Sequence, residues 1–126
     1  MAWQFNQREP VFLQIANRLR SDIVRGEYDR EVQFPSVRQL AAEAAVNPNT
    51  MQKALSYLEE EGLLYTKGTV GRFVTADEET LLLSKEKLRR DFVRRAIEES
   101  RAVGMNADEL IEYIKKEVAE NEYSCT

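Results

Sequence analysis

The sequence predicts a mainly α-helical fold with one small β-hairpin, arranged as a winged helix-turn-helix followed by a two-helix C-terminal dimerisation tail. Three observations support this fold class. All three prolines and four of the five glycines lie where a helical pattern needs a boundary. Two short helical patterns follow each other after a tight turn. The hydrophobic period then changes from helical to alternating in one short stretch, residues 63–75.

The first predicted helix covers residues 10–25. Pro10 suits the first helical turn, and Gly26 suits the left-handed position that commonly ends a helix. Apolar residues recur at three- and four-residue spacing, which gives the helix one buried face. That face consists of Val11, Phe12, Ile15, Ala16, Leu19 and Ile23.

Two further helices follow in close succession. Ser36 and Gln39 have the spacing of a capping box, so the second helix begins at Ser36 and ends near residue 44. Asn47 is a good N-cap and Pro48 a favourable first helical residue, and together they begin the third helix. The short connection between the two helices is typical of a helix-turn-helix.

After the third helix ends at Gly62, the pattern is that of strands. Residues 63–66 and 72–75 are rich in β-branched and aromatic side chains, and they flank a glycine-containing turn at 68–71. We therefore expect a β-hairpin, the wing of a winged helix.

The C-terminal part returns to helical spacing. Residues 77–103 form a long charged pattern, and Asn106 with Glu109 forms a second capping box that opens a final helix. We therefore divide the chain into a winged helix-turn-helix domain, residues 1–76, and a helical dimerisation segment, residues 77–126.

Composition excludes several classes of function. The chain has one cysteine, Cys125, and no histidine, which excludes an internal disulfide, a Cys/His zinc site and His-dependent hydrolytic catalysis. Asp108, Glu109 and Glu112 could align carboxylates on one helix, but capping explains the first two, so we expect no enzyme and no cofactor. The sequence has no membrane-length apolar run and no signal-peptide pattern, so we expect a cytoplasmic protein without a membrane partner.

The net charge of −4 is unevenly distributed. Residues 1–76 carry nine basic and nine acidic side chains, whereas residues 77–126 carry nine and 13. No acidic residue lies between Ala44 and Leu58 or in residues 62–76. A positive face on the predicted helix-turn-helix is therefore compatible with an acidic protein.

The third helix has the outward residues that a DNA-reading helix needs. If its apolar stripe points inward, Asn49, Lys53 and Ser56 point outward, with Thr50 and Gln52 on the flanks. Asn and Gln pair with the adenine edge, while Lys donates to guanine or phosphate. The arrangement is typical of a winged helix that binds double-stranded DNA.

These segments resemble the DNA-binding half of the GntR family of bacterial transcription regulators over about residues 10–75. The tail of only two helices is similar to the YtrA-type subfamily, whose members lack a large effector-binding domain. The resemblance implies a homodimer on an inverted-repeat DNA operator, usually acting as a repressor. It is carried by residues 10–16, Gly26, residues 34–41, 46–54 and 58–63, and the run Gly71-Arg72-Phe73-Val74.

The resemblance also implies which residues contact DNA. Many family members have Arg where this chain has Pro48 and Gln52, so Asn49, Gln52 and Lys53 must read the bases instead. Gly68 and Gly71 match the wing glycines, whose missing Cβ lets the backbone approach the minor groove. The candidate DNA-binding residues are Arg38, Asn47, Asn49, Thr50, Gln52, Lys53, Lys67, Gly68 and Arg72.

The C-terminal helices carry more apolar surface than two helices can bury alone. A second copy of the chain would cover it and provide the two-fold symmetry that an inverted repeat requires. The candidate dimerisation residues are Leu81, Leu88, Phe92, Val93, Ile97, Leu110, Ile111, Ile114 and Val118.

Other interpretations stay open at this stage. A small-molecule effector of unknown identity could bind among the C-terminal helices, although no polar constellation marks a pocket. The winged helix could be a protein-interaction module without DNA binding. Arg72 could pair with the acidic run 59–61 rather than with DNA, and Lys53 and Arg38 could be ordinary solvated helix residues.

Overall fold

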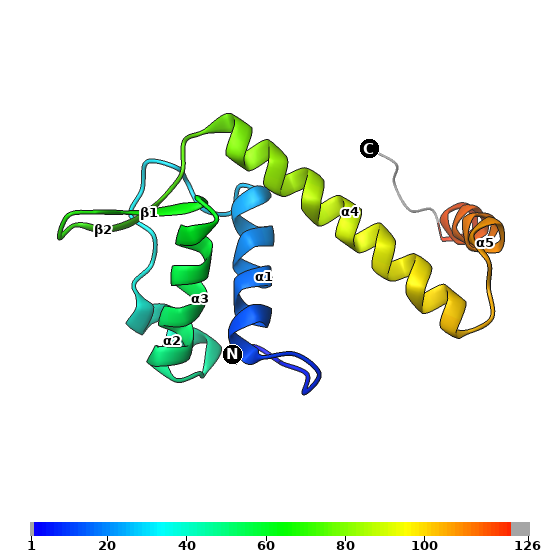
Figure 1. The fold of residues 1–126 in the computed structure, drawn as a ribbon, viewed down its shortest axis with the longest axis horizontal. Coiled ribbons are helices and arrows are strands. Elements are labelled where there is room, and N and C mark those ends of the chain that lie inside the picture. Colours follow the sequence, from blue (N-terminus) through cyan, green and yellow to red (C-terminus); the bar gives the residue numbers. More distant parts are fainter. Residues whose placement is uncertain (1, 122–126) are drawn as a thin grey trace. The chain divides into compact units, whose positions relative to one another are not determined.

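The computed structural model describes residues 2–121 and divides into two compact units between Glu86 and Lys87, within the fourth helix. The elements follow the predicted order (Figure 1). The fold class predicted from the sequence is confirmed. The elements are α1 (Val11–Val24), α2 (Val37–Ala44), α3 (Pro48–Glu60), β1 (Leu64–Lys67), β2 (Gly71–Val74), α4 (Glu78–Ala102) and α5 (Ala107–Glu120).

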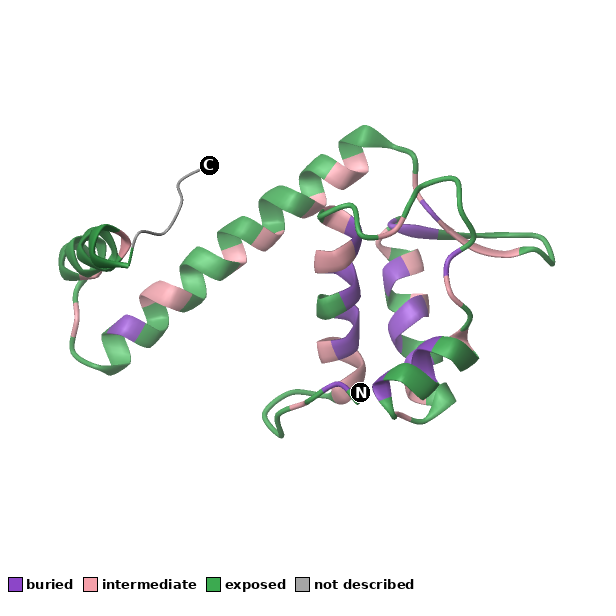
Figure 2. Cartoon of the chain, turned by 180° about the vertical axis from the view of Figure 1, so that it is seen from behind, coloured by how far each residue is buried: buried purple, intermediate pink, exposed green. Residues whose placement is uncertain are grey.

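The first unit is organised around α3, which packs against α1, α2 and β1. The buried faces of α1, α2 and α3 point toward one another (Figure 2). Trp3 joins this core from the N-terminal segment, and the Arg18 guanidinium lies 4.0 Å from its ring centroid. The largest fully buried side chains are Ile15, Leu19, Leu40, Met51, Leu55, Leu58, Leu63, Leu64 and Val74.

The predicted caps of α2 and α3 are present. The Gln39 N–H donates to Ser36 Oγ at 3.1 Å, and the Ser36 N–H donates to Gln39 Oε1 at 3.0 Å. The Asn49 N–H donates to Asn47 Oδ1 at 2.7 Å. Between the helices, Ala45 has φ +58°, a left-handed conformation that a non-glycine side chain disfavours. The tight turn therefore uses a strained alanine that the sequence pattern did not indicate.

The wing consists of β1, β2 and their turn, residues 64–74. Each strand lies within one residue of its predicted position, and Thr66 pairs directly with Arg72. A third piece of sheet was missed: Gln33 forms a bridge with Phe73, and the Phe34 N–H donates to the Arg72 carbonyl at 2.7 Å. A single bridging residue has no periodicity, so pattern analysis had no signal for it.

The second unit consists of the rest of α4 and of α5. The predicted capping box of α5 is present, since the Glu109 N–H donates to Asn106 Oδ1 at 2.9 Å and the Asn106 N–H donates to Glu109 Oε1 at 3.1 Å. Among the described residues of α4 and α5, Ser100 alone is buried. No helix of residues 2–121 has the length and apolar character that a bilayer crossing requires.

Candidate nucleic-acid interface

The buried stripe of α3 determines which of its side chains face the solvent. Met51 and Leu55 are fully buried, and Asn49 is exposed on the opposite side, as the helical spacing predicts. Gln52, expected on the flank, is also exposed, whereas Ser56, expected to point outward, is half-buried. Thr50 is half-buried beside them. The exposed face of the N-terminal half of α3 thus carries uncharged hydrogen-bonding groups together with one cation, Lys53.

Asn47, the N-cap of α3, and Gln52 within the helix both have internal hydrogen bonds. The Asn47 side chain caps the helix through Oδ1, which leaves its amide nitrogen for another partner. The Gln52 Nε2 donates to Ser56 Oγ at 3.1 Å, one turn further along the helix. This bond orients the Gln52 amide along α3 and leaves its carbonyl oxygen free to accept.

Lys53 has a different environment from the one the helical pattern suggests. Its Nζ lies 4.1 Å from the Phe12 ring centroid, a cation–π contact with α1. Phe12 in turn packs edge-to-face on Tyr57, with centroids 6.2 Å apart. Lys53 is exposed, yet its ammonium leans toward α1 in the structure without DNA.

Arg38 and the tip of the wing carry two further accessible cations of the first unit. Arg38 is exposed in the first turn of α2 and has no ion-pair partner among residues 2–121. Lys67 is also exposed, and its Nζ lies 5.9 Å from the Phe73 ring centroid. Gly68, at φ +52°, has no heavy atom within 4 Å of the place where a Cβ would stand. The tip therefore leaves open space in which a nucleic-acid backbone would fit.

Gly71 has an internal role that the sequence did not reveal. It has φ +132°, and a Cβ built on it would lie 2.6 Å from Gln33 Nε2. That same nitrogen donates to the Val70 carbonyl at 2.7 Å. The absence of a Cβ at Gly71 thus admits the Gln33 side chain to the wing.

Arg72 pairs within the protein. Its Nε donates to Glu59 Oε1 at 2.6 Å, and the Thr66 hydroxyl donates to the same oxygen at 2.7 Å. Partial burial of Glu59 opposes ionisation, but the two hydrogen bonds and the positive charge of Arg72 outweigh it and lower the pKa of Glu59. The open interpretation that Arg72 pairs with the acidic run is therefore realised in the structure.

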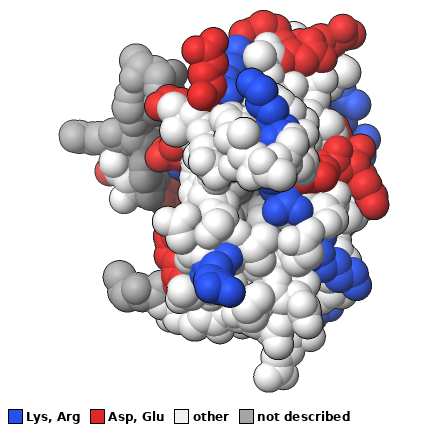
Figure 3. Space-filling view, turned by 90° about the vertical axis from the view of Figure 1, so that its left-hand side faces the viewer, with Lys and Arg blue, Asp and Glu red and all other residues white. Residues whose placement is uncertain are grey.

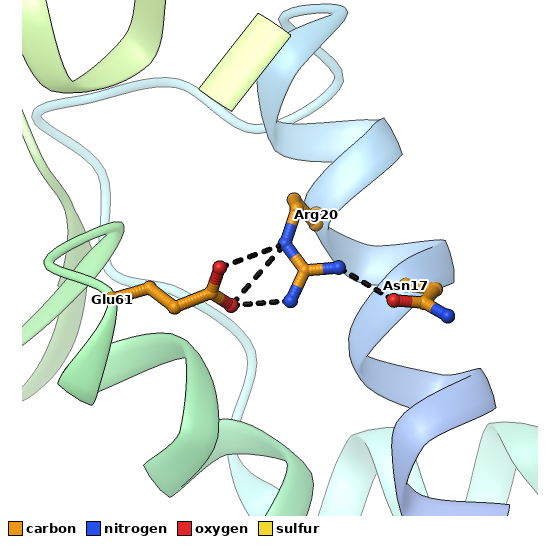
Figure 4. Close-up of polar contacts among 3 residues, drawn as sticks. All are labelled: Asn17, Arg20 and Glu61. Carbon is orange, nitrogen blue, oxygen red and sulfur yellow. Dashed lines mark hydrogen bonds and ion pairs between the residues drawn. The ribbon is translucent and has the colours of Figure 1, made fainter. Parts of the chain in front are cut away.

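A second ion pair joins α1 to the end of α3. Arg20 is 7% exposed, and its Nε donates to both carboxylate oxygens of Glu61 at 3.2 Å (Figure 4). Its Nη1 donates to Asn17 Oδ1 at 2.6 Å. The sequence analysis missed this pair, although Arg20 stands four residues after Ala16 on the buried face of α1 and thus carried a detectable signal. The pair fixes the C-terminal end of α3 on α1.

The charges on the face that carries the wing are separated. Figure 3 shows basic side chains standing singly on a largely uncharged surface, while acidic side chains lie at the top and along the two sides of the view. In chain order this matches the absence of acidic residues from Ala44 to Leu58. Such a surface suits the contact of a polyanion through hydrogen bonds and a few cations.

The candidate dimerisation residues have unequal exposure. Leu81 packs against the core of the first unit, so its burial has an explanation within one protomer. Leu88, Ile97, Leu110 and Val118 are half-buried. The four exposed members are Phe92 at 67%, Val93 at 54%, Ile111 at 49% and Ile114 at 51%. Further exposed apolar side chains, which the helical spacing did not single out, are Leu82, Leu83, Val103 and Tyr113.

The second unit also has a shallow hollow of about 180 Å³. It is lined by Phe92, Arg95, Ala96 and Glu99, all from one helix. The small-molecule effector stays a prediction.

Comparison with known proteins supports the interpretation of the α3 surface as a nucleic-acid interface. The profile of the bacterial regulatory proteins of the gntR family matches residues 12–74. In sequence, the chain is 33% identical to the uncharacterised HTH-type transcriptional regulator YhcF of Bacillus subtilis, over 89% of this chain and 93% of that protein. It is 29% identical to the HTH-type transcriptional repressor YtrA of the same organism, over 85% of this chain and 83% of the repressor.

Solved structures agree with these relatives. A GntR family transcriptional regulator from Listeria monocytogenes has a TM-score of 0.78 at 30% identity, covering 89% of this chain and 98% of that one. The AraR DNA-binding domain in complex with operator ORE1 has a TM-score of 0.51 at 25% identity, covering 60% of this chain and 93% of that one. The similarity thus extends to a domain solved on DNA.

Proposed function

Because the chain belongs to the gntR family of bacterial regulatory proteins, it is a DNA-binding transcriptional regulator and not an enzyme, and we propose that it represses transcription as a homodimer on an inverted-repeat operator. The observation that carries the proposal is the exposed face of the N-terminal half of α3, residues 48–54, which holds hydrogen-bonding side chains and no acidic residue. Repression would be steric and would need no cofactor. The protein would act in the cytoplasm, where its DNA target lies.

In this proposal the N-terminal half of α3 enters the major groove. Asn49 and Gln52 would read base edges, and Thr50 would contact phosphate or a thymine methyl group. Asn47 would donate its free amide to the DNA backbone, and Lys53 would leave the Phe12 ring to reach a base or phosphate. A released cation–π contact costs about 0.5–1 kcal/mol at an exposed site, which a phosphate contact offsets.

Two further contacts would position the protein on the duplex. Arg38 would bind a phosphate or base at the edge of the site, close to the partial positive charge of the α2 N-terminus. Lys67 and Gly68 at the tip of the wing would follow the backbone near the minor groove. The domain assignment proposed for this function is DNA binding by residues 1–76 and dimerisation by residues 77–126.

Selection of bound duplexes from a random DNA pool tests the proposal, followed by titration of the enriched duplex at several salt concentrations. We expect an inverted repeat bound by two protomers. Binding should weaken steeply with salt, because each neutralised phosphate contributes about 0.9 to the slope of log affinity against log salt. No enrichment by a folded dimer would instead favour the protein-interaction module.

Variants then separate backbone contacts from base contacts. Arg38→Ala should reduce the salt slope by about one and weaken all duplexes similarly. Gln52→Ala should relax the preference at one base pair by roughly 1–3 kcal/mol. Arg101→Ala, which removes an exposed arginine from the end of α4, is the matched control and should change neither quantity.

A further inference from the structure

We propose that Glu59 is the positioning residue of the wing: it fixes β1 and β2 on the recognition helix α3, and Arg72 serves this bond instead of contacting a phosphate. The proposal rests on the DNA-binding function and adds a residue that the sequence analysis did not assign to it. It also replaces the expectation, drawn from the family resemblance, that Arg72 contacts DNA.

The geometry at Glu59 joins three elements. One carboxylate oxygen accepts from Arg72 Nε at 2.6 Å and from Thr66 Oγ at 2.7 Å. Thr66 lies on β1 and Arg72 on β2, and the two are directly opposed in the hairpin register. A single side chain of α3 therefore holds both strands of the wing at the same level.

Glu59 lies in the last turn of α3, where a carboxylate needs a compensating partner. Acidic residues in the last turn of a helix lie near the partial negative charge of the helix end, which disfavours them. Glu61 compensates for this through Arg20 of α1, and Glu59 through Arg72 of β2. The end of α3 is thus tied to α1 by one carboxylate and to the wing by another.

The same geometry makes Arg72 a poor phosphate ligand. Its side chain is 18% exposed, and its charge is already balanced by Glu59. Moving Arg72 to a phosphate would leave the Glu59 carboxylate unpaired beside a polyanion. Lys67, which is exposed and has no carboxylate partner among the described residues, is the cation that the wing can offer to DNA.

The test compares Glu59→Ala with Glu60→Ala in the full-length protein. Both variants remove one negative charge from neighbouring positions, but Glu60 is exposed and outside the wing contact. Without DNA, amide hydrogen exchange at residues 64–74 should become at least tenfold faster in Glu59→Ala and stay unchanged in Glu60→Ala. Exchange in α1 should not change in either variant. Glu59→Gln should restore part of the protection, since its carbonyl oxygen still accepts from Thr66.

DNA binding supplies the second measurement, on the duplex selected by the wild type. Relative to Glu60→Ala, Glu59→Ala should weaken binding about tenfold. Arg72→Ala should weaken it to a similar degree without lowering the salt slope, and the double variant should be no weaker than either single one. If Glu59→Ala does not fold, Glu59→Gln takes its place, with the same directions and a smaller change.

Three outcomes would overturn the proposal: unchanged exchange in the wing of Glu59→Ala, a salt slope lowered by about one in Arg72→Ala, or additive losses in the double variant. If the wild type binds no duplex, the DNA-binding function fails while the exchange measurement still decides whether Glu59 holds the wing.

Discussion

The winged helix buries its apolar side chains, whereas the helical region beyond it leaves many of them exposed. In the first, the helices and the hairpin bury a common core around α3. In the second, the described part of α4 and α5 buries Ser100 alone, while Phe92 is 67% and Val103 74% exposed. Figure 2 shows the same contrast as buried faces on α1 to α3 and largely exposed surfaces on α5.

The comparison teaches that the two regions need different things in order to be stable. The winged helix buries its apolar side chains in its own core, caps α2 and α3 with its own side chains and pairs its buried Arg20 with Glu61. The helical region has the capping box of α5, but it exposes large apolar side chains to water. Each Å² of apolar surface left exposed forgoes about 25 cal/mol of burial free energy. A chain that exposes such a surface to water is expected to cover it by association, and a second copy would make that association symmetric.

The largest expected effect breaks the core of the first region. Leu55→Ala removes a fully buried side chain of α3 and should lower the free energy of unfolding by about 2–5 kcal/mol. Urea denaturation at two protein concentrations measures this loss, which should be the same at both. Val103→Ala is the control below the dissociation constant of the dimer, where it should stay within about 0.5 kcal/mol of the wild type because Val103 is exposed in the single protomer. Equal losses in the two variants would contradict the comparison.

The second effect concerns association. Ile114→Glu places a charge on the exposed apolar face of α5 and should raise the dissociation constant of the homodimer about a hundredfold, or about 2.7 kcal/mol. Sedimentation equilibrium measures it, and circular dichroism should show that the winged helix stays folded. Lys116→Glu, on the other side of α5 by helical spacing, is the control. A wild type that is monomeric at all concentrations would remove the argument for a second copy.

The difference between the regions also explains how much of the fold the sequence predicts. Ser36, Asn47 and Asn106 act through residues two or three positions away, so local spacing predicts their helices within a residue or two. The bridge at Gln33 depends on Phe73, 40 positions away, which periodicity does not contain. The left-handed Ala45 ends α2 without the glycine that usually marks such a position.

The candidate site shows the same limit. Asn49 and Gln52 are exposed as predicted, because helical spacing alone determines which way they point. Arg72 is paired because α3 and β2 meet in space, and Arg20 is paired with Glu61, 41 positions away in the sequence, because α1 packs on α3. Sequence patterns therefore find the face of α3, whereas the charges that remain available on it depend on the tertiary fold.

The third effect tests how far the tight packing of the first region extends into the wing. Gly71→Ala should lower the free energy of unfolding by about 2 kcal/mol, because an alanine disfavours φ +132° and its Cβ would displace Gln33. Gly68→Ala, at φ +52° in open space, should cost about 1 kcal/mol from backbone strain alone. Thermal unfolding of both variants measures the difference, and equal costs would show that Gln33 contributes nothing.

The smallest effect is that of replacing a buried serine of α4, which should raise the free energy of unfolding in the first region but not in the second. Ser84 lies in the part of α4 that belongs to the first unit, and its buried hydroxyl has no hydrogen-bond partner among the described residues. Ser84→Ala removes that unsatisfied group and favours the helix, so it should raise the free energy of unfolding by about 0.5 kcal/mol.

Ser100 is the matched control in the second unit. It is also buried, but its hydroxyl donates to the Ile97 carbonyl at 2.7 Å. Ser100→Ala loses this hydrogen bond and gains helix propensity. It should therefore leave the free energy of unfolding unchanged or lower it by up to about 0.5 kcal/mol. Urea denaturation at protein concentrations below and above the dissociation constant of the dimer distinguishes effects within one protomer from effects through a second copy. If Ser84→Ala destabilised the protein only at the higher concentration, its hydroxyl would have its partner in the second copy, and the self-sufficient region would end before Ser84 rather than at Glu86.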